Sequence, residues 1–474
     1  EGSADFGALA GYFAAHRPLP LLLVFLAGFG MKAGLFPMHV WLPEAHPAAP
    51  SHVSALMSGV MIKTGVYGVL RTAMYLPAGE TLATAGVILL GAGIVTGLWG
   101  VLLAAMQNDI KRLLAYSSIE NVGIIFIAIG VALLGRSAGN DAVALCGMAG
   151  ALLHTLNHSF FKSLLFFGAG NLYAETHTTA LDRFGGVARQ MPVTAILFLA
   201  GTAAICALPP LNGFVSEFII YTGMFRSIAE GQQVLLAAAG VTALALIGGL
   251  ALFAFTKLYG IVFLGAPRTH EVAEMHEADN YRIAAAGILF IGLLPWTVLP
   301  LLTKVAATLL PGLGAGRQPA AELPLWAGLT QITLVAAVLI AATALLLVAK
   351  RRALRRRTVA SGPTWGCGFT AVNTRMQYTG ESFVEGLESI VHPFTEEVVE
   401  GKAVDKQEIF PSAHDFDIRR KDRVARLFSA WWVESLRLLN ARVMRLRTGK
   451  INHYILFALL FIVLIFLCSI LNLL

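Results

Sequence analysis

Charged residues are scarce in this chain of 474 residues. Asp, Glu, Lys and Arg together make up 13% of the sequence, whereas hydrophobic residues make up 57% and the mean hydropathy is +0.71. Soluble globular domains carry about 25% charged residues, so this composition excludes an ordinary soluble fold. It predicts an all-α integral membrane protein that crosses the bilayer many times.

The sequence also lacks the motifs that hold cofactors. Its four cysteines lie far apart and form no C-x-x-C pair, so they encode neither an iron–sulfur cluster nor a zinc site. Neither a P-loop nor a G-x-G-x-x-G fingerprint is present, which argues against direct use of ATP and against bound NAD. At His270, the zinc-protease motif H-E-x-x-H fails because Glu274 stands in place of the second histidine. We therefore expect no cofactor and no metal in this chain.

The apolar runs predict the topology. About ten of them are long enough to span a hydrocarbon core of about 30 Å as helices. They fall near residues 18–38, 51–76, 81–106, 110–134, 141–173, 191–226, 233–264, 280–310, 325–348 and 452–474. The basic run at 350–357 follows the ninth span, so the positive-inside rule places residues 350–450 in the cytoplasm and the carboxyl terminus outside. The net charge of +7 is thus explained by cytoplasmic loops rather than by nucleic-acid binding.

Residues 350–450 are polar and offer no convincing soluble core. Within them, apolar residues between 424 and 446 recur at helical spacing, and arginines occupy the remaining positions. This pattern predicts a basic amphipathic helix that lies on the inner membrane surface or along neighbouring helices. An ordinary surface helix packed on a soluble domain is the alternative.

Several ionisable residues lie inside runs that should cross the membrane, among them Lys32, Lys63, Lys162 and Glu217. A charge at the centre of a bilayer costs about 2.5–3.5 kcal/mol. We therefore expect these side chains to face a protein interior or a water-filled path instead of lipid. Lys32 precedes a helix break marked by Pro37, and an interrupted helix at membrane depth is tolerated only where its freed backbone faces protein or water.

A second predicted helix break lies in the sixth span. Pro209, Pro210 and Gly213 mark it, and Glu217 follows a few positions later. Two broken helices, each beside a buried charge, resemble the repeat-built sites of secondary transporters. Lys257 lies nearer the cytoplasmic end of its span, where it either belongs to the ion path or extends its ammonium group to the membrane surface.

The fifth span carries three titratable residues on one helix face. His154, His158 and Lys162 are spaced i, i+4 and i+8. Histidine changes its charge near neutral pH, so such a ladder can pass protons. A metal site on the two histidines lacks a carboxylate or cysteine to complete it. The spacing therefore favours a proton relay over a metal centre.

Four segments of the chain resemble one family of membrane proteins. They are MKAGLFPMHVWLPEAHPAAPSHVSALMSGVMIKTGVYGVLR, QNDIKRLLAYSSIENVGII, HTLNHSFFKSLLFFGAGNLY and LPPLNGFVSEF. The family is that of the antiporter-like, proton-pumping subunits shared by respiratory complex I, multisubunit sodium/proton antiporters and energy-converting hydrogenases. GPTWGCGF at 362–369 and RMQYTGESF at 375–383 look most like the component B branch of formate hydrogenlyase and hydrogenase-4 complexes.

The resemblance implies two inverted five-helix repeats, each with a broken helix. In that scheme residues 1–80 end the first repeat and residues 81–265 form the second. Additional transmembrane helices follow at 266–349, then the cytoplasmic segment at 350–450 and a carboxyl-terminal anchor helix at 451–474. The ten spans match the later helices of the family, so we expect the chain to be the later part of a longer, N-terminally truncated protein.

The resemblance also assigns roles to individual positions. Proton-path roles are implied for Lys32, Lys63, His154, His158, Lys162 and Glu217. The family's further glutamate, which pairs with the lysine of the first repeat from an earlier helix, is absent here. Glu44 lies in an expected loop and cannot replace it, which argues against autonomous pumping by this segment.

The predicted function is that of a non-catalytic, ion-translocating subunit of an oxidoreductase complex in a bacterial inner membrane. The resemblance implies that redox chemistry takes place in partner subunits that carry iron–sulfur clusters and a nickel–iron site. Protons are the expected ion, with sodium as the alternative. A subunit of a quinone oxidoreductase or of a Mrp-type antiporter is the first rival interpretation, and a structural membrane anchor is the second.

Overall fold

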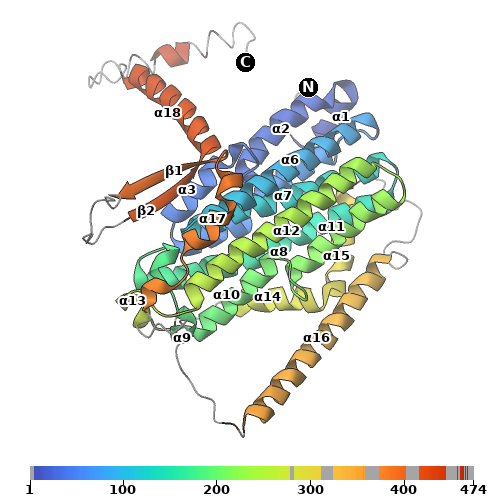
Figure 1. The fold of residues 1–474 in the computed structure, drawn as a ribbon. Helices are drawn as coiled ribbons and strands as arrows, with labels where there is room; N and C mark the ends of the chain where they lie inside the picture. The colour runs from blue at the N-terminus through green and yellow to red at the C-terminus, as the bar shows by residue number, and fades with distance from the viewer. Residues whose placement is uncertain are drawn as a thin grey trace. The chain divides into compact units, whose positions relative to one another are not determined.

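The computed structural model describes residues 5–277, 282–310, 324–355, 357, 373–401, 416–444 and a few positions between 456 and 467. It divides into two compact units, Glu1–Arg420 and Lys421–Leu474, and the helical bundle belongs to the first. The described helices of that bundle are α1 Ala8–Ala15, α2 Pro18–Ala33, α3 Leu42–Ala48, α4 Ser51–Leu56, α5 Ile62–Ala73, α6 Glu80–Met106, α7 Ile110–Ser137, α8 Asp141–Thr176, α9 Val187–Gln190, α10 Pro192–Ile205, α11 Asn212–Ala229, α12 Val234–Phe263, α13 His270–Ala273, α14 Arg282–Leu293, α15 Leu299–Leu309 and α16 Pro324–Leu354 (Figure 1).

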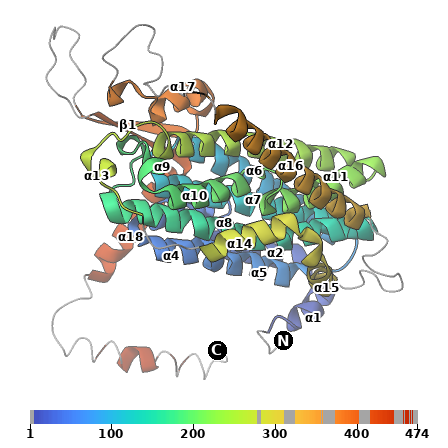
Figure 2. The ribbon, with the colours of Figure 1, turned by 90° about the horizontal axis from the view of Figure 1, so that it is seen from below.

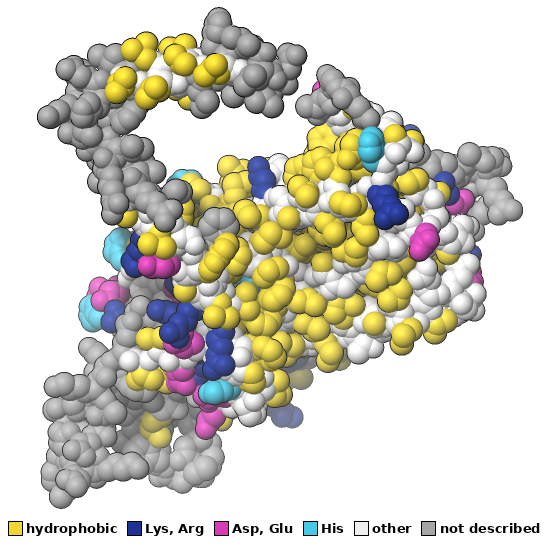
Figure 3. All heavy atoms as spheres, turned by 90° about the horizontal axis from the view of Figure 1, so that it is seen from above, with side chains coloured by type: hydrophobic (Ala, Val, Ile, Leu, Met, Phe, Trp, Pro, Cys, Tyr) yellow, Lys and Arg dark blue, Asp and Glu magenta, His cyan; other side chains and the backbone are white. Residues whose placement is uncertain are grey.

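Long apolar helices dominate this unit, as the composition predicts. Among the described residues, six segments are long and apolar enough to cross a membrane. They are Pro18–Ala48, Ser51–Ala73, Glu80–Met106, Ile110–Ser137, Val234–Phe263 and Ala327–Leu354. Figure 3 shows a broad hydrophobic face with charged side chains gathered near its ends. Large exposed side chains such as Leu235 on α12 and Leu345 on α16 are those expected of lipid-facing helices.

Helix α7 lies inside the bundle. Its most apolar stretch is entirely buried, and it packs against α6 on one side and α8 on another (Figure 2). A helix surrounded by protein can carry polar residues at membrane depth, because their partners come from neighbouring helices. The location of α7 thus creates an interior where charges are tolerated.

Close packing of α6 on α7 depends on glycines. A Cβ atom added to Gly123 of α7 would collide with the backbone of Gly97 on α6 and with the carbonyl oxygen of Gly93. Small residues at helix crossings let two backbones approach closely in membranes. The pair α6 and α7 therefore tolerates no side chain at this crossing.

We expect Gly123→Val to destabilise the bundle by about 3 kcal/mol, because the new side chain must push α6 and α7 apart. Thermal unfolding of the detergent-solubilised protein measures the effect. Gly91→Val on α6 is the matched control, since a Cβ atom there meets nothing within 4 Å. Equal melting temperatures for the two variants would contradict the assigned helix contact.

Three of the predicted spans are interrupted helices. Helix α2 ends at Ala33, Gly34 adopts a left-handed conformation with φ 86°, and Pro37 lies in the connection to α3. The run at 191–226 forms α10 and α11, with Pro209 and Pro210 between them. The run at 280–310 likewise forms α14 and α15, which the single-span prediction missed.

Two details differ from the sequence-based expectations. Gly213 lies in the first turn of α11 rather than in the break, and a Cβ atom there would collide with the carbonyl oxygen of Ala204. Because Gly213 has no side chain, the first turn of α11 can lie against the end of α10. Glu44 belongs to helix α3 instead of a loop, and it forms an exposed ion pair with Arg112 at 2.8 Å.

The segment after residue 350 contains more structure than its polar composition suggests. Helix α17 (Gly380–Val391) buries Val384 and Val391 against Met106 at the end of α6. Strands β1 (Thr395–Gly401) and β2 (Phe416–Asp422) form a two-stranded sheet. The apolar partner of α17 is thus the end of the membrane bundle rather than a separate soluble core.

In the second unit, helix α18 covers Arg423–Met444, which matches the predicted amphipathic helix. Leu427, Trp431 and Leu438 are exposed on it. Most of the predicted anchor helix at 451–474, and the motif at 362–369, lie outside the described residues.

Candidate functional site

Helix α8 carries the histidine–lysine ladder through the interior of the bundle. His154, His158 and Lys162 are each at most 1% exposed. Because α8 packs against α7 and α11, these side chains meet polar groups from both neighbours. The predicted helix is therefore present, and its three titratable side chains are buried.

Lys63 reaches this ladder directly. Its Nζ donates a hydrogen bond to the carbonyl oxygen of Ser58 at 2.7 Å and contacts Nδ1 of His158. The backbone at Met57–Met61 forms a π-helical turn between α4 and α5, and such turns occur frequently at functional sites. The structure thus joins two predicted site residues that lie 95 positions apart.

Lys162 is held against the first half of α7. Its Nζ donates to the carbonyl oxygen of Leu114 at 2.8 Å and to the hydroxyl of Ser117. It also lies 5.9 Å from the centre of the Phe255 ring on α12. These partners are neutral, so a positive charge on Lys162 is solvated by dipoles and by a π face.

His154 connects α8 to both neighbouring helices. Its Nδ1 is 3.0 Å from Oγ of Ser216 on α11, and its Nε2 is 3.0 Å from Oδ1 of Asn121 on α7. Asn121 donates in turn to the carbonyl oxygen of Ser117, the residue that binds Lys162. Ser216 immediately precedes Glu217. A continuous set of polar contacts therefore runs from Lys162 to the residue beside Glu217.

Two buried carboxyl groups flank this set. Glu217 on α11 is 7% exposed and Glu120 on α7 is 1% exposed. Glu120 interacts electrostatically with Lys162 and with Glu217. We call Lys63, His158, Lys162, His154, Glu120 and Glu217 the polar axis.

Sequence reasoning did not select Glu120 as a site residue. The available signal was the run Ser117–Asn121, SSIEN, inside a span that is otherwise almost wholly apolar. Of this run, Ser117 binds Lys162 and Asn121 binds His154. A polar cluster in the most buried helix of a membrane bundle is therefore as informative as an isolated lysine.

Some buried polar atoms along the axis have no hydrogen bond to the described residues. They are Nε2 of His158, Oε2 of Glu120, Oδ1 of Asn212 and both ring nitrogens of His46. His46 is completely buried, stacks on Phe166 at 4.7 Å and interacts electrostatically with Lys63 and Lys162. Buried polar groups of this kind normally bind ordered water.

Lys32 does not contact the polar axis. It lies in the last turn of α2 with its side chain exposed, whereas Leu22, Leu26 and Ala33 form the buried stripe of that helix. Because α2 packs on α5 through a face that excludes Lys32, this structure does not place the lysine in a protein interior.

Lys257 is buried but belongs to a different network. It is 0% exposed, and its Nζ donates at 2.7 Å to the carbonyl oxygens of Ala105 and Gln107 at the end of α6. In this structure the ammonium group of Lys257 therefore does not extend to the membrane surface.

Among the described residues no group of three or more His, Cys, Asp or Glu side chains could hold a metal ion.

Comparison with known proteins gives three kinds of match. The family model described as "NADH:quinone oxidoreductase/Mrp antiporter, TM" matches residues 1–247. Hydrogenase-4 component B of Escherichia coli is 46% identical over 290 residues, which cover 58% of this chain and 43% of the relative. Formate hydrogenlyase subunit 3 of the same organism is 36% identical over 354 residues, which cover 73% and 56%.

Solved structures show the same fold. A chain of the Mrp complex from a Dietzia species superposes with a TM-score of 0.54 at 20% identity, covering 66% of this chain and 63% of that chain. The chain described here spans less than two thirds of the length of the curated relatives that it matches.

Proposed function

Because this chain belongs to the NADH:quinone oxidoreductase/Mrp antiporter membrane family, we propose that it moves protons through the polar axis as a subunit of an energy-converting hydrogenase complex. The likeness to hydrogenase-4 component B and to formate hydrogenlyase subunit 3 supports this branch of the family. A bacterial inner membrane is the proposed location.

The observation that carries the proposal is the contact between Lys63 and His158. It links α5 to the ladder on α8, and the ladder continues through His154 to Ser216 beside Glu217. Groups coupled in this way titrate together, so a proton that arrives at one changes the charge state favoured at the next. Charge switching along the polar axis would then move a proton across the second half of the path.

Water would complete the gaps between these groups. The free ring nitrogen of His158, the free oxygen of Glu120 and the imidazole of His46 all lie in this interior. Each can bind a water molecule that bridges to a neighbouring group. We therefore include His46 as a proposed member of the path, between Lys63 and Lys162.

Electron transfer would take place outside this chain. We propose that peripheral subunits with iron–sulfur clusters and a nickel–iron site supply the energy, and that other membrane subunits flank the bundle. This chain would bind no redox cofactor itself. Its role would be to couple electron transfer in the partner subunits to proton movement.

Glu217→Gln tests the proposal. Removing the carboxyl charge should lower proton uptake by at least about fivefold, because the last acidic group of the axis can no longer exchange a proton. Uptake is measured with a pH-sensitive dye in vesicles that contain the complete complex, energised by formate. Glu80→Gln, at an exposed position of α6, is the matched control. Normal uptake by correctly assembled Glu217→Gln would reject Glu217 as a path residue.

A further inference from the structure

Residues 373–401 form a segment that crosses the polar end of the membrane bundle, and we call it the strap. Gln377 pairs with the backbone of Ala266, just after α12, through bonds of 2.8 and 3.1 Å. Arg268 donates to the carbonyl oxygen of Tyr378. Asp182 accepts a bond of 2.7 Å from the backbone nitrogen of Gly380. The strap is therefore tied to two separate connections of the bundle.

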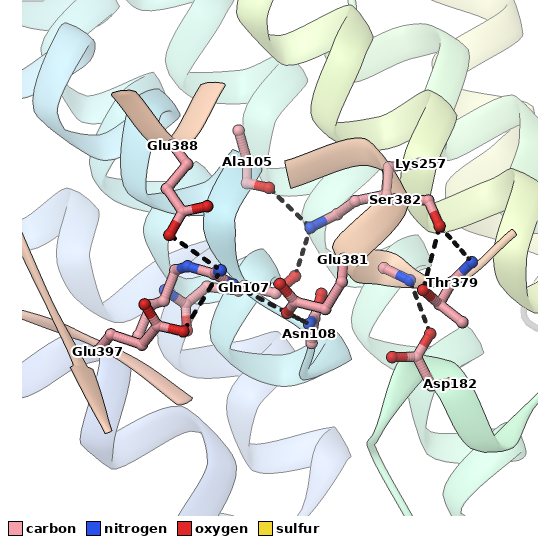
Figure 4. A network of polar contacts seen from close by, with 12 residues as sticks. Ala105, Gln107, Asn108, Asp182, Lys257, Thr379, Glu381, Ser382, Glu388 and Glu397 are labelled. Atoms are coloured by element: carbon pink, nitrogen blue, oxygen red, sulfur yellow. Dashed lines mark hydrogen bonds and ion pairs between the residues drawn. The ribbon is translucent and has the colours of Figure 1, made fainter. Parts of the chain in front are cut away.

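Lys257 of α12 is a buried charge of the bundle that interacts with the strap. It interacts electrostatically with Glu381 of the strap, with Asp182 and with Arg420. Figure 4 shows Lys257 directed at Ala105 and Gln107 at the end of α6. Its two hydrogen bonds go to neutral carbonyl groups, so its nearby counter-charges come from outside α6 and α12.

Glu381 is held in place by two partners. It accepts a hydrogen bond from Asn108 at 2.5 Å and forms an ion pair with Arg420 at 2.8 Å. The Arg420 side chain is only 4% exposed and also lies 4.0 Å from Glu388 and from Glu397. A buried guanidinium among carboxylates fixes their positions, since each charge left unpaired would be costly.

The carbonyl groups bound by Lys257 end helix α6 directly before helix α7. Cations at a helix carboxyl terminus satisfy its free carbonyl oxygens and its dipole. Helix α7 begins at Ile110, and Leu114 and Ser117 of its first turns bind Lys162. The α6–α7 junction thus lies between Lys257 and the polar axis.

We propose that the strap is an electrostatic latch in which Glu381, positioned by Arg420, is the counter-ion of Lys257 and thereby fixes the α6–α7 junction. Lys257 is then a positioning residue instead of a member of the proton path. The consequence for transport rests on the function proposed above. The latch itself does not, since it concerns only the position of the junction.

Hydrogen–deuterium exchange of the complete protein in detergent tests the latch. In Glu381→Gln, amide exchange at residues 104–113 is expected to rise by about tenfold, because local opening of the junction becomes easier. Lys257→Met should raise exchange in the same residues. Exchange in the buried part of α8 should stay unchanged in both variants. Glu385→Gln, at an exposed position of the same helix α17, is the matched control.

A charge-swapped variant tests whether the charge of residue 381 toward Lys257, and not only its ion pair with residue 420, holds the junction closed. Glu381→Arg combined with Arg420→Glu restores opposite charges to that pair, but it places a cation beside Lys257. Under the latch, exchange at the junction therefore stays high in the double variant. Wild-type exchange in Glu381→Gln, or an equal rise in Glu385→Gln, would overturn the proposal. So would loss of proton uptake in Glu381→Gln with unchanged exchange, because Glu381 would then act in the path itself.

Discussion

Lys162→Met is expected to lower proton uptake by at least about tenfold, equivalent to about 1.4 kcal/mol in the barrier. Lys162 is the only residue of the polar axis that binds the backbone of α7 and also interacts with Glu120. Methionine has a similar length and fills a similar volume. The substitution therefore removes the exchangeable proton with little change in packing. Uptake is followed with a pH-sensitive dye in vesicles that contain the assembled complex.

Lys162→Arg distinguishes a relay from a structural charge. Arginine keeps the positive charge but does not release a proton at physiological pH. A relay therefore stays inactive in Lys162→Arg, whereas a residue that serves only as a counter-charge for Glu120 would be rescued. Lys304→Met, at an exposed position of α15, controls for the loss of a lysine. Normal uptake by assembled Lys162→Met would reject the relay and favour a structural anchor.

The second large effect is expected at the contact between Lys63 and His158. His158→Asn keeps a hydrogen-bond acceptor near the position of Nδ1, but asparagine does not titrate. We expect uptake to fall by at least about tenfold in His158→Asn and in Lys63→Met, because each variant interrupts the same transfer. The initial rate of dye quenching measures both variants and their combination.

Coupling between the two positions is the decisive result. If the residues act as one unit, the double variant should be no slower than either single variant. His177→Asn is the matched control, since His177 is exposed at the end of α8 and asparagine tolerates its left-handed conformation, φ 51°. Fully multiplicative losses in the double variant would show that Lys63 and His158 act independently.

Local chemistry made part of this site predictable. The spacing of His154, His158 and Lys162 places them on one face of any α-helix, whatever surrounds it. The proline pair Pro209–Pro210 interrupts a helix because it removes backbone donors, and the structure separates α10 from α11 there. The apolar spans follow from composition alone.

The contacts that the site residues make with other helices were not predictable in the same way. Lys32 and Lys63 both lie deep in apolar runs, yet one is exposed and the other contacts His158. Which of them faces inward depends on the rotation of α2 and α5 against their neighbours. Rotation is set by packing contacts between residues far apart in the chain, and a single helix pattern does not contain them.

The sequence by itself determined that the chain is a helical membrane protein with titratable groups on α8 and breaks near Pro37 and Pro209, because helix periodicity, hydropathy and proline geometry act within a few residues. Only the tertiary structure decided that Lys63 contacts His158, that Glu120 is buried within the electrostatic reach of Lys162 and that Lys257 donates to the end of α6. The reason is physical. A buried charge takes its role from the dipoles and charges around it, and folding brings those from distant segments such as the strap.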